Sequence, residues 1–371
     1  MKVWWAVQNF PLVTLPVLRR PFSGIDFSSQ SLSSCHSSHY RDPFSVVLRR
    51  VVANPRSDLY LSGGVLRHQP PIIDGNLDHS FDFSSPKKWV TRSSLGDNFL
   101  NVKFSFPMKT FQSVSLLFGF YPNTWYHWLL NILPKLWMAL ESGHLLQAPV
   151  LVPPNALRGT FWESLSAVVS KRIEIRSAGS GPIFVDRAQV LLSPYFEAPG
   201  RLGHLDDSMM PLGSFCIHCL RNFRDRISES ISAMGLTASS VKADKIYLRR
   251  TGSARPIDDS DLVHSLLRKG FVVVEPESLS FAEQVLLFRR ARVVVGVSGS
   301  VFANLLFSEE ADVYVLQPEF LGSSPFLEIS KIGSNRLTTV GFRTQEKNWS
   351  TYYRSVTPTR VTGEDLLDFL G

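Results

Sequence analysis

The strongest constraint on the fold is a repeated alternation of apolar runs and helix-like segments in the second half of the chain. Apolar runs that are rich in β-branched residues predict buried strands at 245–249, 271–275, 291–296 and 312–316. The segments between them predict helices at 259–269, 280–288 and 301–307. Strands and helices in this order form a parallel sheet with crossover helices. The second half is therefore predicted to be a Rossmann-like β-α-β-α-β-α-β unit.

Local signals mark the ends of two of these helices. Gly270 is expected to stop the first, with Arg268 and Lys269 placed at its negative end. Ser280 followed by Glu283 three residues later predicts a capping box at the start of the next.

A less regular alternation precedes this unit. Strands are predicted at 46–52, 59–66, 114–120, 149–153, 172–175 and 188–192. Helices are predicted at 126–140, where Pro134 should cause a kink, at 157–169, and at 212–234, a bridge to the second unit. From residue 114 onward, the alternation of strands and helices implies a second parallel sheet with crossover helices.

Length and composition suit two α/β domains. The chain has 371 residues, of which 44% are hydrophobic and 19% are charged, so it can build two cores. We divide it into an N-terminal extension of short strands and loops (1–95), a Rossmann-like domain (96–236), a second Rossmann-like domain (237–340) and a tail that packs back (341–371).

The charge is basic but dispersed. Lys and Arg number 39 against 32 acidic residues, which gives a net charge of +7. This balance favours anionic partners such as a phosphorylated small molecule. Nucleic-acid binders concentrate their charge on one face or arm, whereas here the longest basic runs are arginine pairs. We therefore expect no nucleic-acid partner.

No stretch approaches the ~20 apolar residues that span a bilayer. The N-terminus carries Trp4 and Trp5, with Arg19 and Arg20 further on, which is compatible with an interfacial anchor. We expect a soluble cytoplasmic protein, with peripheral membrane contact as an open alternative.

Three cysteines are too few for a disulfide framework. Cys216 and Cys219 have CxxC spacing, but a zinc ribbon needs a second pair, and only Cys35 remains. We interpret the two as small residues on one face of a helix at 214–231.

Three loops follow predicted strands at the carboxyl edge of the second sheet, where open α/β sheets bind ligands. The first, 249–255, carries three arginines, whose guanidinium groups suit diphosphate oxygens. The second, 275–280, leads into the capped helix. The third, 296–300, is a Gly/Ser turn at a helix start, which favours close backbone approach to a phosphate.

Three segments of the chain resemble glycosyltransferase family 61. They are 279–307, 246–250 and 126–135, in the family's order and rough separation. The resemblance implies a GT-B-like α/β fold, with two Rossmann-like domains facing a cleft. It also implies inverting transfer of a sugar such as xylose or N-acetylglucosamine from a UDP-sugar. The acceptor is then a glycan, polysaccharide or lipid-linked glycan, bound by domain 96–236, and domain 237–340 binds the donor. Bacterial members serve surface polysaccharide synthesis.

The resemblance also assigns site residues. His127 takes the role of base or acceptor-positioning residue, because imidazole titrates near neutrality. The diphosphate is expected to be held by Arg250, Arg255, Gly296, Ser298, Gly299 and Ser300. Gln284 and Asn304 either position the donor or brace its loop.

Some positions depart from the family pattern. Ser298 stands where a histidine is usual, Ser300 replaces an alanine, and Asn131 and Val315 replace acidic residues. These changes motivate an alternative function, a catalytically degenerate relative that acts as a nucleotide-binding or scaffolding protein.

Asp259 and Asp261 match the DxD pattern of metal-dependent transferases. They fall at a predicted helix start, where carboxylates interact with the positive end. We interpret them as capping residues and expect no metal or other cofactor.

Overall fold

The computed structural model describes residues 12–16, 45–57, 59–62, 65–68, 90–93, 96–103, 109–119, 121–169, 173–191, 193, 195–196, 214–235, 243–251, 255–321, 324, 326–345, 352, 355, 357–361 and 366. Two compact units divide the chain, one of residues 1–200 and the other of residues 201–371. The four-part division drawn from the sequence stays a prediction. The N-terminal tryptophans lie outside the described residues.

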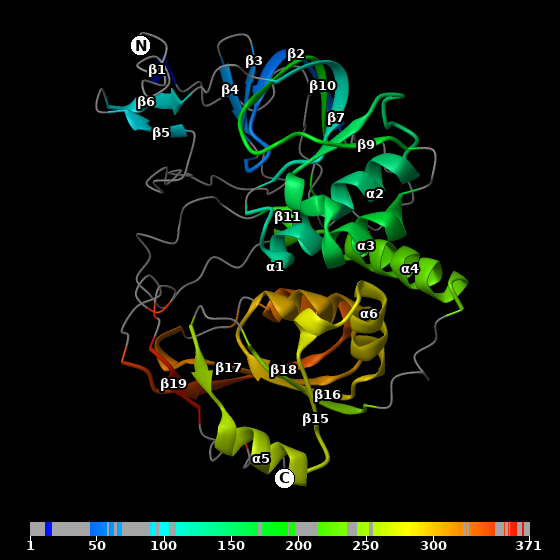
Figure 1. The fold of residues 1–371 in the computed structure, drawn as a ribbon, viewed down its shortest axis with the longest axis vertical. Coiled ribbons are helices and arrows are strands. Elements are labelled where there is room, and N and C mark those ends of the chain that lie inside the picture. Colours follow the sequence, from blue (N-terminus) through cyan, green and yellow to red (C-terminus); the bar gives the residue numbers. More distant parts are fainter. Residues whose placement is uncertain are drawn as a thin grey trace, which may run out of the picture. The chain divides into compact units, whose positions relative to one another are not determined.

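Unit 1–200 contains a mixed seven-stranded sheet in the order β4-β3-β2-β10-β7-β8-β9 (Figure 1). Its strands are β2 (Ser45–Ala53), β3 (Leu59–Ser62), β4 (Val65–His68), β7 (Lys109–Leu116), β8 (Val150–Val152), β9 (Ile175–Ser177) and β10 (Ile183–Leu191). Strands β10, β7, β8 and β9 run parallel, but β2 pairs antiparallel with β10 and continues into the antiparallel β3 and β4. The parallel arrangement predicted for the strands from residue 114 onward is therefore confirmed. The strands predicted at 46–52 and 59–66 join this sheet in antiparallel pairs, and the single strand expected at 59–66 is two strands.

The helix predicted at 126–140 has an irregular start. It consists of α1 (Trp125–His127), a π-helical turn η2 (Trp128–Ile132) and α2 (Leu133–Glu141). In the π turn the Leu133 N–H donates to the Trp128 carbonyl, five residues back. Pro134 follows directly and has no N–H to donate, so the predicted distortion lies in the turn that precedes it.

The rest of unit 1–200 is made of short elements. The 3-10 turn η3 (Pro154–Leu157) leads into α3 (Gly159–Val168), and β11 (Tyr195–Phe196) lies near the end of the unit. Strands β1 (Leu12–Pro16), β6 (Gly96–Lys103) and β5 (Val90–Ser93) form a separate antiparallel sheet.

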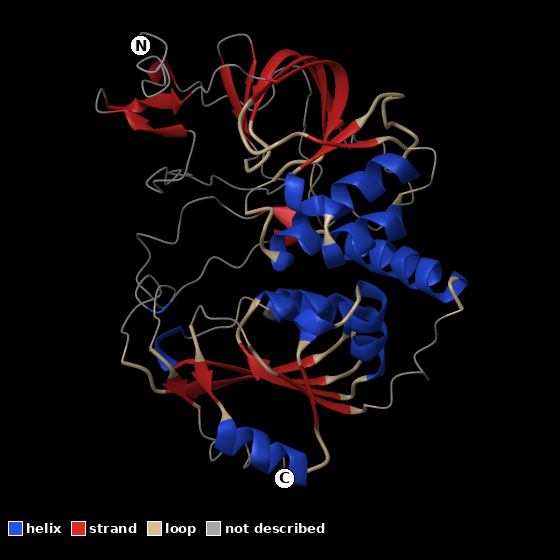
Figure 2. Ribbon diagram, viewed as in Figure 1, coloured by secondary structure: helices blue, strands red, loops and turns tan. Residues whose placement is uncertain are grey.

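Unit 201–371 contains a five-stranded sheet in the order β15-β13-β16-β17-β18, and every neighbouring pair is parallel. The strands are β13 (Lys245–Leu248), β15 (Val272–Val274), β16 (Val293–Val297), β17 (Asp312–Pro318) and β18 (Arg336–Phe342). Helix α5 (Ser260–Arg268) covers one face, and α6 (Phe281–Arg290) covers the other (Figure 2). The predicted Rossmann-like architecture is confirmed here at the level of an α/β sheet with crossover helices, with β18 as an additional strand.

Local signals in this unit are confirmed. Ser280 and Glu283 form the expected capping box of α6, and Gly270 follows α5 in the left-handed region with φ +80°. Two expectations are corrected. The segment at 301–307 belongs to a 3-10 helix, η7 (Ser300–Phe307), and the helix expected from residue 214 is α4 (Ile217–Ala233), which starts after the short strand β12 (Ser214–Phe215).

Short elements complete unit 201–371. They are η6 (Pro276–Ser278), η8 (Glu319–Leu321), α7 (Leu327–Ser330), η9 (Lys331–Gly333) and the parallel pair β14 (Ile257–Asp258) and β19 (Thr359–Arg360). Of the helices in the described part of the chain, none has the length and apolar character needed to cross a membrane.

Candidate functional site

The strand order of unit 201–371 places a topological switch point between β13 and β16. From β13 the chain moves to β15 on one side and returns to β16 on the other. In open parallel sheets the crevice at such a point, outside the carboxyl ends of the strands, is where ligands bind. Two of the three predicted ligand loops, those after β13 and β16, begin at this point.

The structure brings Arg250 together with the turn that follows β16. The Arg250 guanidinium donates from Nη1 to the Ser298 carbonyl oxygen at 3.4 Å. Ser298 is buried, and its N–H donates to the Leu316 carbonyl on the neighbouring β17 at 2.8 Å. Gly299 is extended, with φ −170°, and a Cβ placed there would lie 3.7 Å from Arg250 Nη1. Gly299 therefore leaves room beside the guanidinium group. Its extended backbone is one that any residue can adopt, so the conformation does not require glycine.

Gly296 and Ser300 lie on either side of this pair in different environments. A Cβ on Gly296 would lie 2.9 Å from Leu248 Cβ and 3.2 Å from Phe302 Cζ, so the glycine permits close packing of β16 against β13. Ser300 is exposed and is the first residue of η7. The geometry gives Gly296 a packing role and leaves Ser300 accessible.

Gln284 and Asn304 form a buried amide pair. Asn304 Nδ2 donates to Gln284 Oε1 at 2.8 Å, and Gln284 Nε2 donates to the carbonyl oxygens of Pro276 at 2.9 Å and Leu279 at 3.2 Å. Asn304 is fully buried and Gln284 is 5% exposed. The pair thus ties α6 and η7 to the loop after β15. Of the two roles expected from the sequence, positioning the donor or bracing its loop, this arrangement suits bracing.

Arg255 lies against the C-terminal segment. Arg255 is buried, and its guanidinium carbon lies 5.6 Å from the centre of the Tyr352 ring. Its backbone N–H donates to the Ser355 carbonyl at 3.1 Å. Its backbone is left-handed, with φ +52°. Residues 252–254 lie outside the described part of the chain.

The two carboxylates of the DxD pattern lie in different environments, and only Asp259 is buried. Asp259 accepts from Tyr247 Oη at 2.8 Å and from Arg249 Nη2 at 3.3 Å, and its side chain makes no cap on α5. Burial, followed by the Asp259 charge and hydrogen bond, raises the pKa of Tyr247 well above its usual value. Asp261 is exposed and pairs with Arg360. The capping interpretation is therefore wrong for Asp259, and no group of three or more potential metal ligands occurs among the described residues.

In unit 1–200, His127 directly precedes the π turn. Its ring lies 5.2 Å from that of Tyr121 and 5.4 Å from that of Tyr126, between ring centres. A π turn of this kind is often found at a functional position. Asn131, within the turn, is 5% exposed, and its Oδ1 has no hydrogen-bond partner in the structure. One turn further on, the fully buried Lys135 donates from Nζ to the Phe118 carbonyl at 2.7 Å.

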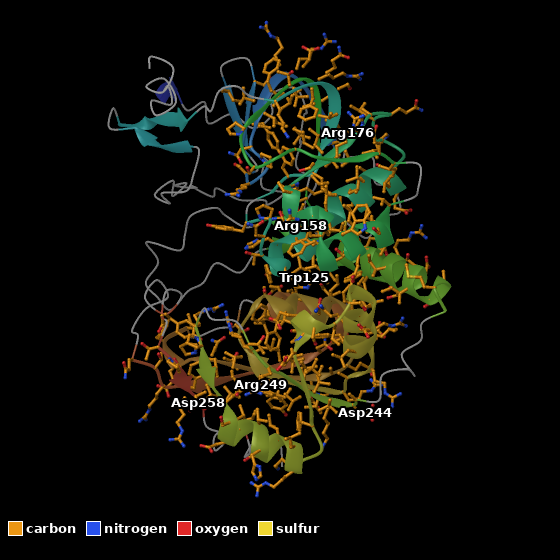
Figure 3. The ribbon with its side chains drawn as sticks, viewed as in Figure 1. Trp125, Arg158, Arg176, Asp244, Arg249 and Asp258 are labelled. Atoms are coloured by element: carbon orange, nitrogen blue, oxygen red, sulfur yellow. The ribbon has the colours of Figure 1, made fainter. Side chains whose placement is uncertain are left out.

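A surface cavity of about 380 Å³ lies beside this helix. Its described lining residues include two arginines and no acidic residue: Arg56, Asn123, Pro153, Pro154, Asn155, Arg158, Phe161 and Ser180. Asn155 Nδ2 donates to the Pro122 carbonyl at 2.7 Å, which holds the loop before α1 against the β8–α3 connection. Phe161 also packs edge-on against Trp125 of α1, with 5.4 Å between the ring centres. Trp125 and the lining residue Arg158 are labelled in Figure 3. Residues from four separate segments form this cavity, and no sequence motif indicated it.

The chain matches a known protein family. The sequence model of a family described as Glycosyltransferase 61 matches residues 125–315, from α1 into β17. No curated protein matches the chain. All the candidate site residues fall within the matched span, in both units.

Proposed function

Because the chain belongs to glycosyltransferase family 61, we propose that it transfers a hexosyl or pentosyl group from a UDP-sugar to a glycan, polysaccharide or lipid-linked acceptor, with inversion. The observation that carries the proposal is the contact of Arg250 with the Ser298–Gly299 turn at the switch point. In this proposal the two units correspond to the donor and acceptor halves of a GT-B enzyme that serves polysaccharide biosynthesis in the cytoplasm.

The donor half supplies positive potential for the departing diphosphate. As the bond between sugar and diphosphate breaks, negative charge grows on the phosphate oxygens, and fixed donors aimed at them lower the barrier. Arg250 offers a guanidinium group, and Ser298 and Ser300 offer hydroxyl donors. The Gln284–Asn304 pair keeps the supporting loops in place.

The acceptor half supplies the base. In an inverting transfer the acceptor hydroxyl must lose its proton as it attacks the anomeric carbon. We assign proton removal to His127, and acceptor binding to the cavity lined by Arg158 and Phe161. Proline and aromatic surfaces suit the apolar face of a sugar ring, while arginine and asparagine side chains suit its hydroxyl and acidic groups.

Titration of the full-length protein with UDP and a panel of UDP-sugars tests the donor site. We expect calorimetric binding and thermal stabilisation by UDP, because a ligand that binds only the folded state stabilises it. Arg250→Ala should abolish this binding. Arg290→Ala is the matched control, because Arg290 ends α6 and pairs with Asp244, just before the start of β13. If neither UDP nor any UDP-sugar stabilises the wild type, or if Arg250→Ala binds UDP normally, the donor site is misassigned.

Transfer assays with mass-spectrometric detection test the acceptor half. His127→Gln should keep UDP binding and lose transfer to any acceptor that the wild type glycosylates. UDP binding by a wild-type protein that glycosylates no acceptor would instead favour the degenerate, nucleotide-binding relative.

A further inference from the structure

The two thiols of the CxxC segment lie in direct contact at the start of α4. Cys216 is the N-cap residue, and its Sγ lies 2.6 Å from the Sγ of Cys219. The Cys219 N–H also donates to Cys216 Sγ at 3.4 Å. A disulfide bond is about 2.05 Å long, so closure requires the two sulfurs to approach by only about half an ångström. The sequence-based interpretation of two small helix residues does not account for this contact.

The surroundings of the two thiols differ in a way that suits sequential chemistry. Cys216 is half-buried and reachable from solvent, whereas Cys219 is only 6% exposed. Both lie at the N-terminus of a helix of 17 residues, where backbone N–H groups and the helix dipole favour a negatively charged sulfur.

We propose that Cys216 and Cys219 are a redox-active dithiol whose substrates are low-molecular-weight disulfides. The Cys216 thiolate attacks one sulfur of the disulfide RSSR, which forms a mixed disulfide and releases one RS⁻. The Cys219 thiolate then attacks Cys216 Sγ, closes the intrachain disulfide and releases the second RS⁻. The two thiol protons leave with the two thiolates as RSH, so the dithiol is oxidised by two electrons and RSSR is reduced. This inference does not depend on the proposed transferase function.

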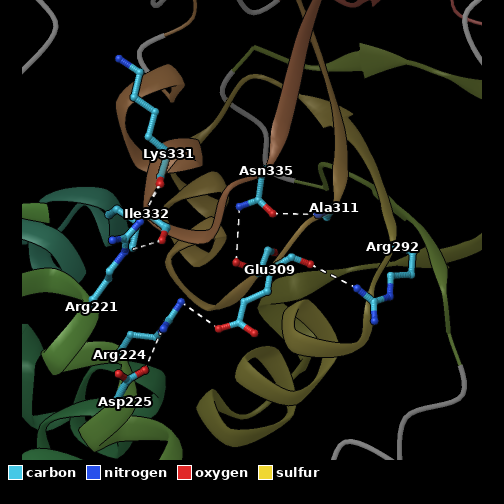
Figure 4. Close-up of polar contacts among 10 residues, drawn as sticks. Arg221, Arg224, Asp225, Arg292, Glu309, Ala311, Lys331, Ile332 and Asn335 are labelled. Atoms are coloured by element: carbon cyan, nitrogen blue, oxygen red, sulfur yellow. Dashed lines mark hydrogen bonds and ion pairs between the residues drawn. The ribbon is translucent and has the colours of Figure 1, made fainter. Parts of the chain in front are cut away.

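The dithiol begins a helix that braces the rest of unit 201–371. Arg221 donates from Nε to the Ile332 carbonyl at 2.9 Å, and Arg224 pairs with Glu309 at 2.9 Å (Figure 4). Glu309 follows η7, and Ile332 belongs to η9. Oxidation of the pair therefore constrains the first turn of the helix that anchors both segments.

Full-length protein equilibrated in glutathione buffers, then acid-quenched, alkylated under denaturing conditions and digested, tests the proposal by mass spectrometry. With oxidised glutathione in excess, we expect the peptide containing both cysteines to be unalkylated and two hydrogen atoms lighter. Dithiothreitol should restore full alkylation. The measurement is repeated in a Cys35→Ser background, so that a bridge to Cys35 is distinguished.

Two variants in that background separate the roles of the sulfurs. Cys219→Ser should accumulate a glutathione adduct on Cys216, because the thiol that resolves it is gone. Cys216→Ser should leave Cys219 unmodified and keep the fold, since serine is also a favourable N-cap residue. Full alkylation of both wild-type thiols in oxidised glutathione, or a disulfide that forms only with Cys35, would overturn the proposal.

Discussion

The two units support their candidate residues in different ways. In unit 201–371 these residues follow strands of one parallel sheet, and backbone segments approach closely. Gly296 lets β16 pack against Leu248 of β13, and Arg250 reaches a main-chain carbonyl at the end of the neighbouring strand. Added volume is therefore the main threat to this arrangement.

In unit 1–200 the support comes from buried polar side chains around an irregular helix. Lys135 holds the carbonyl at the end of the β7 region, and Trp128 Nε1 donates to Ser164 Oγ at 2.9 Å. Each such bond satisfies a group that is out of reach of water, so its loss costs desolvation energy. We therefore expect the stability of unit 201–371 to be sensitive to added methyl groups, and that of unit 1–200 to lost hydrogen bonds.

The largest effect is expected at Gly333 of unit 201–371, where two backbone segments approach closely. A Cβ on Gly333 would lie 1.8 Å from the Ser308 carbonyl oxygen and 2.9 Å from its carbon, both of which are backbone atoms. Gly333→Ala should lower the free energy of unfolding by about 4 kcal/mol or more, measured by urea denaturation. In Gly299→Ala the nearest atoms lie at 3.5 and 3.7 Å, so this control should change stability by at most about 1 kcal/mol. Equal stability of the two variants would break the comparison.

The second prediction compares two buried amide side chains of unit 1–200, those of Gln189 and Asn131. Gln189 Oε1 accepts from Ser115 Oγ and the Leu146 N–H, and its Nε2 donates to Ser45 Oγ and the His144 carbonyl, all within 2.9 Å. Gln189→Leu leaves these partners unsatisfied and should cost about 3 kcal/mol in urea denaturation.

Asn131→Leu is the matched variant. Because Asn131 Oδ1 has no hydrogen-bond partner in the structure, its removal should cost about 1 kcal/mol or less. If transfer activity nevertheless falls, Asn131 serves the reaction and not the fold. A large loss of stability in Asn131→Leu would contradict the description of the π turn.

The same contrast explains what the sequence could predict. In unit 201–371 each strand, helix and cap is encoded by neighbouring residues, so the capping box of Ser280 and the strand ends that carry Arg250 and Ser298 were found. Strand β18 was not, because Arg336 and two threonines interrupt its apolar pattern. In unit 1–200, β2 pairs with β10, more than a hundred residues later in the chain, and no local signal records that pairing.

Site features that depend on three-dimensional contacts were also missed. The segment 128–132 is apolar almost all round, so periodicity cannot distinguish a π turn from an α-helix. The position of Asp259 at a helix start predicts a cap, but its carboxylate accepts from Tyr247 and Arg249 instead.

The third prediction concerns the one described cluster of unit 201–371 that is built around a buried carboxylate. Tyr247→Phe removes the hydrogen bond to Asp259 and should cost about 1–2 kcal/mol. An unfolded tyrosine ionises near pH 10, whereas burial beside Asp259 raises the pKa of Tyr247, so the folded state holds its proton longer. Wild-type stability should therefore fall as pH rises past about 10, and more steeply than that of the variant. If the stabilities of the two proteins changed in parallel with pH, the interaction of Tyr247 with Asp259 would be contradicted.

The smallest expected effect lies at the exposed start of α6. Hydrogen bonds from the Ser280 hydroxyl and N–H lower the pKa of the Glu283 carboxyl below its usual value. The ionised Glu283 therefore stabilises the fold above the pKa of an unfolded glutamate, about 4.3. This stabilisation is lost as the pH falls through the lower pKa of the folded state. Glu283→Ala should cost about 0.5 kcal/mol at neutral pH, because the site is exposed to solvent, and the difference from wild type should vanish in acid. Glu283→Gln keeps an acceptor for the Ser280 N–H without the charge. If it matches wild type at neutral pH, the hydrogen bond alone supports the cap, and if it matches Glu283→Ala, the charge is required.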